Sequence, residues 1–86
     1  MIIKLNKKLA NILMNEVENT SSLIIKQKEL TNNLIEIEVS DIEEIQLLIN
    51  DEIVLKGLNN QDTVNSYGKR LYELYDEIYY QRYNSN

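Results

Sequence analysis

The sequence predicts a single α+β domain over residues 1–86, with the element order α-β-β-α-α. Apolar residues recur at spacings of three and four in three separate segments, which is the pattern of one buried face of an α-helix. Two shorter runs rich in β-branched residues lie between the first and second of these segments, and they are typical of strands. At 86 residues, 43% apolar and 27% charged, the chain can form one small core.

The first predicted helix covers about residues 7–18. Asn6 is its expected N-cap, and the polar run 19–22 ends it because these side chains compete for backbone hydrogen bonds. Ile2 and Ile3, ahead of the helix, form either a short edge strand or loose apolar packing, and the sequence does not decide between the two. The apolar face of the helix is formed by Leu5, Leu9, Ile12, Leu13 and Val17.

The two predicted strands cover about residues 22–29 and 34–39, and Thr31-Asn32-Asn33 connects them as a hairpin loop. Asparagine suits such a loop because it tolerates the left-handed conformation. A three-residue loop sets lysines opposite glutamates, whereas a two-residue Asn-Asn loop sets Glu29 opposite Glu36. Since favourable cross-strand pairs contribute about 0.2–1 kcal/mol each and like charges cost as much, we expect the register of the three-residue loop.

In this register Lys28 lies opposite Glu36, and Lys26 lies opposite Glu38. These four charged side chains are expected to face water, because the apolar side chains of residues 34–39 alternate with Glu36 and Glu38 and the two lysines lie opposite these glutamates. The residues expected to face the core are Ile25, Ile35, Ile37 and Val39.

The second predicted helix covers about residues 41–56. Ser40-Asp41-Ile42-Glu43 has the spacing of a capping box, and Gly57 suits the left-handed position that ends many helices. A hairpin over residues 45–55, turning at Asn50-Asp51, is the alternative, and it lacks both of these end signals. The apolar stripe of the helix is formed by Ile42, Ile45, Leu48, Ile49 and Ile53.

The third predicted helix covers about residues 61–83, with Asn60 or Asp62 as its N-cap. It has two stripes, one mainly aliphatic and one of tyrosines about a quarter turn away. Gly68, near the join of the stripes, costs ~1 kcal/mol relative to alanine, and it either admits a close neighbour or is merely tolerated. The aliphatic stripe comprises Val64, Tyr67, Leu71, Leu74 and Ile78, and the tyrosine stripe comprises Tyr72, Tyr75, Tyr79 and Tyr83.

Composition excludes several classes of function. The chain has no cysteine and no histidine, so it cannot form disulfides or thiolate–metal sites, and it lacks the commonest general base. Its two glycines cannot build a glycine-rich phosphate-binding loop. No apolar run reaches the ~20 residues of a membrane span, and the N-terminal apolar run is too short for a signal peptide. We therefore expect a cytoplasmic, non-enzymatic protein with no cofactor, no metal and no membrane partner.

Charge is unevenly distributed along the chain. Residues 32–66 carry eight acidic residues against Lys56 alone, a net charge of −7 within a total of −5. Such a block repels a phosphate backbone, so direct nucleic-acid binding is not expected. The block either imitates nucleic-acid phosphates in a basic groove of a host enzyme or only keeps a small domain soluble. The acidic side chains concerned are Glu36, Glu38, Asp41, Glu43, Glu44, Asp51 and Glu52.

The run KGLNNQDTVNSYGKRLYELYDEIYYQ, residues 56–81, resembles the C-terminal part of small uncharacterised proteins from phages and prophages of low-GC bacteria. It covers under a third of the chain and has no catalytic motif. The resemblance implies a phage accessory role, including inhibition of a host defence protein. Strand 34–39 followed by two helices also has the element order of ribbon-helix-helix repressors, but its outward Glu36 and Glu38 are unlike the basic or polar residues with which that family reads DNA.

The tyrosine stripe is the leading candidate for a binding surface. Tyrosine is favoured at interfaces because its large rigid ring is buried while its hydroxyl remains hydrogen-bonded. We therefore expect a protein–protein interaction module that forms a dimer or higher homo-oligomer and binds a protein partner. A half-exposed margin of the core is the alternative interpretation. The residues concerned are Tyr72, Tyr75, Tyr79 and Tyr83.

A small-ligand binder remains open as a different class of function. In it, oligomerisation forms the pocket and the tyrosines stack a nucleotide base. Lys69, Arg70 or Arg82 then contacts the phosphate of the nucleotide. A protein of this kind sequesters nucleotides without catalysing a reaction.

Overall fold

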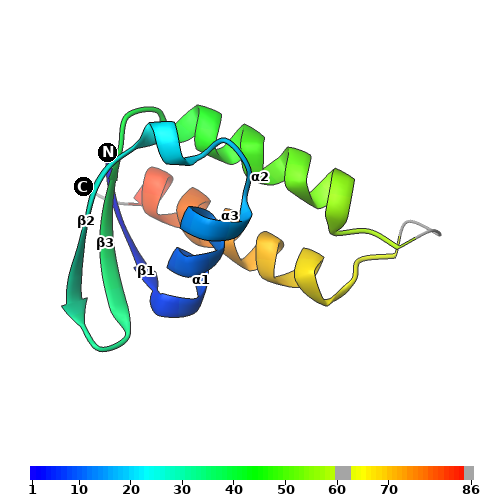
Figure 1. Cartoon of the computed structure of the whole chain (residues 1–86), viewed down its shortest axis with the longest axis horizontal. Coiled ribbons are helices and arrows are strands. Elements are labelled where there is room, and N and C mark those ends of the chain that lie inside the picture. The colour runs from blue at the N-terminus through cyan, green and yellow to red at the C-terminus, as the bar shows by residue number, and fades with distance from the viewer. Residues whose placement is uncertain (60–62, 85–86) are drawn as a thin grey trace.

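The computed structural model describes residues 1–59 and 63–84 and shows an α+β fold in which helices cover one face of a three-stranded antiparallel sheet (Figure 1). The predicted fold class is confirmed, with one strand more than the predicted order. The molecule is elongated, with extents of 39 × 26 × 25 Å. Its elements are β1 (Ile2–Asn6), α1 (Lys7–Asn11), the π-helical turn η1 (Ile12–Glu16), the 3₁₀ turn η2 (Ser21–Leu23), β2 (Ile24–Thr31), β3 (Leu34–Val39), α2 (Ile42–Lys56) and α3 (Ser66–Asn84).

The additional strand is β1, which decides the open question about Ile2 and Ile3. The strand order is β1-β3-β2, so β3 is central and β1 lies antiparallel beside it. Ile3 pairs with Ile37 and is fully buried, because alternate residues of both strands point toward the helices. The N-terminal ammonium also donates a hydrogen bond of 2.9 Å to the Val39 carbonyl.

The predicted charge register of the hairpin is confirmed. Lys28 lies opposite Glu36 and Lys26 opposite Glu38. The predicted three-residue loop is wrong, because Thr31 pairs with Leu34 and the turn contains only two residues; a shift in the ladder between Glu29 and Thr31 supplies the extra residue that keeps the charge register. The expected left-handed asparagine in this turn is wrong: among the described residues other than glycine, only Asn19 has a positive φ, of 68°.

The prediction that Ile25 faces the core is wrong. A second ladder shift lies between Ile24 and Lys26, which makes Ile25 the extra residue of a β-bulge and removes it from the alternation. Its side chain is 58% exposed. The other three residues predicted to face the core, Ile35, Ile37 and Val39, are buried. The strand also begins later than predicted, because Ser21–Leu23 form the turn η2.

The first predicted helix is shorter than expected and changes its hydrogen-bonding pattern. The N-cap is confirmed, since Asn6 Oδ1 accepts a hydrogen bond of 2.8 Å from the Leu9 amide. The α-helix ends at Asn11 and continues as the π-helical turn, after which Val17 is already extended. The buried Thr20 hydroxyl closes this end by donating to the carbonyls of Leu13 and Val17, at 2.7 and 3.1 Å.

Residues 42–56 form the helix α2, so the hairpin alternative for this segment is wrong. Its N-cap is Asp41, whose Oδ1 accepts a hydrogen bond of 3.1 Å from the Glu44 amide, and not the Ser40 of the predicted capping box. Gly57 at its C-terminus is right-handed, with φ −89°, so the predicted left-handed end is also wrong. Its lack of a side chain matters for a different reason, which is the packing of α2 against α3.

The helix α3 begins at Ser66, five residues later than predicted. Asn65 accepts a hydrogen bond of 2.8 Å from the Gly68 amide through Oδ1, as an N-cap does. The two N-caps that the sequence suggested, Asn60 and Asp62, lie outside the described residues. Val64 is not part of the helical stripe, because it forms an isolated antiparallel bridge with Leu58.

The core lies between the sheet and the helices. Every strand except β2 contributes buried residues to it, together with α1, η1, α2 and α3. The aliphatic stripe of α3 is buried from Leu71 to Ile78 as predicted, with Tyr67 packed against its margin. The core residues are Ile3, Leu5, Leu9, Ala10, Ile12, Leu13, Val17, Ile35, Ile37, Val39, Ile45, Ile49, Ile53, Leu71, Leu74 and Ile78.

Candidate functional site

The helices α2 and α3 lie side by side and antiparallel, and they are fixed to each other at both ends (Figure 1). At one end Gly57 meets Gly68: a Cβ on Gly57 would lie 2.9 Å from the Gly68 Cα, and a Cβ on Gly68 would collide with the Gly57 carbonyl oxygen. At the other end Arg82 Nη1 donates a hydrogen bond of 2.7 Å to Gln46 Oε1. The close approach of a neighbour that the sequence left open for Gly68 is therefore present.

This register brings apolar side chains of the two helices together on the outer surface. Counting residues from the two fixed ends places Val54 at about the level of Tyr72 along the helix axes, and Leu47 at about the level of Tyr79. Tyr75 lies between the two tyrosines along α3 and lines a shallow groove with Leu47. We call these five residues the α2–α3 face.

Four of the five side chains of the α2–α3 face are about half exposed. The exposed fractions are 44% for Tyr72, 52% for Tyr79, 57% for Leu47 and 61% for Val54. Tyr75 is half-buried and packs against the core. The core is thus already filled by the aliphatic stripe, and the neighbouring rings of Tyr72 and Tyr79 lie outside it.

The tyrosine stripe continues to the end of α3. The rings of Tyr79 and Tyr83 lie 4.6 Å apart between centroids and are tilted by 47°, which is a favourable aromatic geometry. Tyr83 is 59% exposed, and the guanidinium carbon of Arg82 lies 5.1 Å from its ring centroid. The groove of about 400 Å³ between α2 and α3 ends at this guanidinium and at Glu43.

The one exposed tyrosine of α3 outside the tyrosine stripe lies on a different surface. Tyr80 is 63% exposed and lines a depression toward α1 with Asn6 and Leu9. Three carboxylates share this depression with it, those of Glu73, Asp76 and Glu77. Tyr80 therefore differs from the exposed tyrosines of the α2–α3 face in its surroundings: it lies among carboxylates, whereas the five residues of that face are all uncharged.

The three cations predicted to contact an anion are not brought together. Arg82 is already bound within the chain, because its Nη2 lies 2.8 Å from Glu43 Oε1 while Nη1 holds Gln46. Lys69 and Arg70 are exposed near the other end of α3. Twelve or thirteen residues of helix separate them from Arg82, which is about 20 Å along the axis. A single phosphate therefore cannot contact all three within one subunit.

The acidic residues do not form one surface either. Glu36 and Glu38 lie on the open face of the sheet, opposite lysines of β2. Glu43 and Glu44 lie in the first turn of α2, on the helical layer that covers the other face. Glu52, predicted to belong to this surface, is buried and only 4% exposed. That part of the prediction is wrong, because tertiary contacts enclose this carboxylate.

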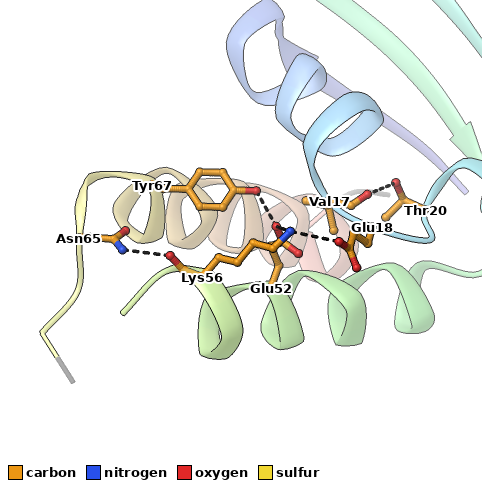
Figure 2. A network of polar contacts seen from close by, with 7 residues as sticks. All are labelled: Val17, Glu18, Thr20, Glu52, Lys56, Asn65 and Tyr67. Atoms are coloured by element: carbon orange, nitrogen blue, oxygen red, sulfur yellow. Dashed lines mark hydrogen bonds and ion pairs between the residues drawn. The ribbon is translucent and has the colours of Figure 1, made fainter. Parts of the chain in front are cut away.

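Glu52 is the centre of a polar network that sequence reasoning missed (Figure 2). The Tyr67 hydroxyl donates a hydrogen bond of 2.9 Å to Glu52 Oε2, and Lys56 Nζ lies 3.4 Å from the same oxygen. Lys56 Nζ also lies 3.1 Å from Glu18 Oε1, in the loop that precedes β2. The Lys56 carbonyl accepts a hydrogen bond of 2.9 Å from Asn65 Nδ2. The network thus joins both helices to the first half of the chain.

Both proton donors in this network hold their protons tightly. Burial, followed by the hydrogen bond to Glu52, raises the pKa of Tyr67 above its ordinary value of 10.0. The hydrogen bond to Glu18, followed by the Glu52 charge, raises the pKa of Lys56 above 10.5. At neutral pH Tyr67 is therefore a neutral donor and Lys56 a cation, which are the forms that the hydrogen bond and the ion pairs of the network require. This arrangement stabilises structure.

We expect the free energy of unfolding to fall as the pH rises above about 10, and to fall less in a Tyr67→Phe variant. The raised pKa of Tyr67 means that the unfolded chain loses this proton near pH 10.0 while the folded chain keeps it. The stabilisation that the protonated Tyr67 hydroxyl contributes is thus complete below pH 10 and is lost at higher pH. Urea denaturation from pH 8 to pH 11 measures how steeply the free energy of unfolding falls with pH in the wild-type protein and in Tyr67→Phe. An equal fall in the two proteins contradicts the role given to Tyr67.

Within residues 1–59 and 63–84, no helix has both the length and the apolar character needed to cross a membrane. The same residues contain no group of three or more acidic side chains arranged to hold a metal ion. Comparisons with protein-family models, with curated proteins and with solved structures find no match. The function of the chain is therefore inferred from its own geometry.

Proposed function

We propose that this protein is a non-enzymatic protein–protein interaction module that binds through the α2–α3 face. The observation that supports the proposal is the grouping of Tyr72, Tyr79, Leu47 and Val54, each about half exposed, on two helices whose register is fixed. Rigid aromatic rings lose little conformational freedom on binding and are enriched among the residues that dominate interface energies. An exposed apolar patch of roughly 300–600 Å² is often functional in a monomeric protein.

The occupant of the α2–α3 face is a second copy of the chain. A two-fold interface places the same surface against itself, so it must be self-complementary. Most of the surface of a protein with net charge −5 is unsuited to this, because like charges meet. The α2–α3 face contains no charged side chain, and its tyrosine hydroxyls and Asn50 in the adjoining groove can donate and accept hydrogen bonds across a two-fold axis.

The dimer is the form in which the module acts. The resemblance of residues 56–81 to proteins of phages and prophages includes Tyr72, Tyr75 and Tyr79, and it supports a phage accessory role. Inhibition of a host defence protein is the specific role to test within that class. The host protein is then bound by surfaces that the dimer leaves open.

Sedimentation velocity tests the tyrosine half of the face. We expect a dimer at micromolar concentration, and we expect Tyr72→Ser combined with Tyr79→Ser to weaken the dimer by about 100-fold, since each residue supplies the energy of an interface hot spot. Tyr80→Ser is the matched control, because it removes a somewhat more exposed tyrosine of the same helix from another surface. A monomeric wild-type protein, or equal effects of the two sets of substitutions, contradicts the proposal.

A second pair of substitutions, one test and one control, examines the aliphatic half of the α2–α3 face. Leu47 and Leu55 are 57% and 74% exposed on the same helix, but Leu55 lies about 80° further around it and lines a different depression, with Glu18 and Asp51. We expect Leu47→Asp to disrupt the dimer and Leu55→Asp to leave it intact, because only the first places a carboxylate against its own copy.

A further inference from the structure

The two edges of the sheet differ in whether another strand can join them. At the β1 edge, Gln81 of α3 occupies the backbone groups of Lys4: the Lys4 amide donates a hydrogen bond of 2.8 Å to Gln81 Oε1, and Gln81 Nε2 donates to the Lys4 carbonyl. Glu77 Oε2 holds the same Nε2 at 3.0 Å. A side-chain amide thus occupies the outward backbone groups in the middle of β1, so another strand cannot pair along the whole of this edge.

The hydrogen bonds between β1 and β3 indicate which backbone N–H and C=O groups of β2 point away from the sheet. Met1 and Val39 exchange hydrogen bonds, and the Lys7 amide donates to the Asn33 carbonyl. Bonded pairs alternate with unbonded pairs in an antiparallel ladder. The odd-numbered residues of β3 therefore bond to β1, and the even-numbered residues bond to β2.

The even-numbered residues Glu38 and Glu36 of β3 pair with Lys26 and Lys28 of β2, so the backbone groups of these two lysines point toward β3. The N–H and C=O groups of the residues next to them, Gln27 and Glu29, therefore point away from the sheet, to its outer edge. Every residue from Ile25 to Thr31 is exposed, on both faces of the strand. Figure 1 shows β2 at the end of the molecule, beyond the helices. This edge is open, in contrast to the edge at β1.

We propose that the open edge of β2 binds an extended segment of another protein, which adds to the sheet as a fourth strand and carries carboxylates at alternate positions. Lys26 and Lys28 project from one face of this edge, two residues apart. Among the described residues, neither lysine forms an ion pair within 4.0 Å. The chain itself shows the matching pattern, since Glu36 and Glu38 of β3 face the same two lysines.

A second copy of β2 does not fit this edge. A two-fold pairing centred on Lys28 sets that lysine against itself, and one centred on Gln27 sets Lys26 against Lys28. A pairing centred on Glu29 sets two glutamates against each other. Like charges directly opposite are destabilising, so each of these pairings is disfavoured and the occupant comes from a different protein.

The bulges limit the length of the added strand. They lie at the two ends of the regular segment, and each leaves an apolar side chain exposed, Ile25 at 58% and Leu30 at 37%. Bulges of this kind interrupt an edge and prevent indefinite stacking of strands. The partner therefore pairs over a short segment and has apolar residues at the ends of its acidic pattern.

An NMR titration tests the proposal with a capped seven-residue peptide in which three glutamates alternate with valine and threonine. We expect the amide signals of Gln27 and Glu29 to shift on addition of this peptide and their hydrogen exchange to slow. The same peptide with lysine in place of glutamate is expected not to bind. Replacing both lysines of the edge, Lys26→Thr with Lys28→Thr, should weaken binding on the order of tenfold.

A proline at the open edge separates strand addition from charge attraction alone. Gln27→Pro removes an outward N–H and no ladder bond, so the fold is retained while the added strand is blocked. Unchanged peptide binding by this variant, equal binding of the lysine peptide, or no shift in β2 at millimolar peptide overturns the proposal. The Tyr72→Ser, Tyr79→Ser variant should bind the peptide normally, because the β2 edge and the α2–α3 face are separate surfaces.

Discussion

Replacing Gly68 by alanine should lower the free energy of unfolding by about 2–3 kcal/mol, as expected for an overpacked contact. The new methyl group would meet the backbone of Gly57, which cannot move aside as a flexible side chain does. In an ordinary helix interior the same substitution stabilises by about 1 kcal/mol. The sign of the change therefore reports the contact between α2 and α3. Urea denaturation followed by circular dichroism measures it.

Lys69→Ala is the control for this prediction, because Lys69 is the next residue of the same helix and is exposed. Its effect should stay within about 0.5 kcal/mol. An unchanged or increased stability of Gly68→Ala would show that the helices do not meet at Gly57. The register that places Val54 beside Tyr72 would then be wrong as well.

Replacing Glu52 by alanine should lower the free energy of unfolding by about 2–3 kcal/mol, because it removes a buried acceptor and leaves a cavity. The Tyr67 hydroxyl loses the carboxylate that it donates to at 2.9 Å. Lys56 loses one of its two ion-pair partners, and the two helices lose a link. Chemical denaturation of the variant at pH 7 measures the change.

Glu18→Ala is the matched control for Glu52→Ala, since it removes the other carboxylate that contacts Lys56. The Glu18 side chain is 67% exposed, and exposed ion pairs contribute about 0–1 kcal/mol. We therefore expect a much smaller loss than for Glu52→Ala. Equal losses for the two variants would mean that the buried position of Glu52 has no energetic importance.

The parts of the fold that depend on local pattern could be predicted from the sequence. The alternation of Ile35 and Ile37 with glutamates determines which face of β3 is buried. The charges of the hairpin predicted its register, because the observed alignment sets Lys26 and Lys28 opposite glutamates, whereas a regular two-residue hairpin sets Glu29 opposite Glu36. The aliphatic stripe of α3 has the helical period and is buried as that period indicates.

The parts that depend on contacts between distant segments could not be predicted. Gly57 has the sequence position of a left-handed helix end, but its conformation is right-handed and its lack of a side chain serves the contact with Gly68. Ile25 follows the strand alternation in the sequence, and only the bulge exposes it. A bulge depends on pairing with β3, which no local pattern of β2 encodes.

The candidate site shows the same division. The tyrosine stripe of α3 is visible in the sequence, whereas Leu47 and Val54 are recognisable as its neighbours only when α2 lies antiparallel beside it. Glu52 and Lys56 form an i,i+4 pair that the sequence does contain. Its burial depends on Tyr67, fifteen residues away, and on the loop around Glu18.

Isotope-filtered NMR on a mixture of labelled and unlabelled copies tests most directly whether the α2–α3 face binds a second copy. Nuclear Overhauser effects between copies should connect the methyl groups of Val54 and Leu47 with the rings of Tyr72 and Tyr79. They should disappear when both tyrosines are replaced by serine and persist in Tyr80→Ser. Contacts between copies that involve only other residues, or no contacts between copies at millimolar concentration, would contradict the proposed interface.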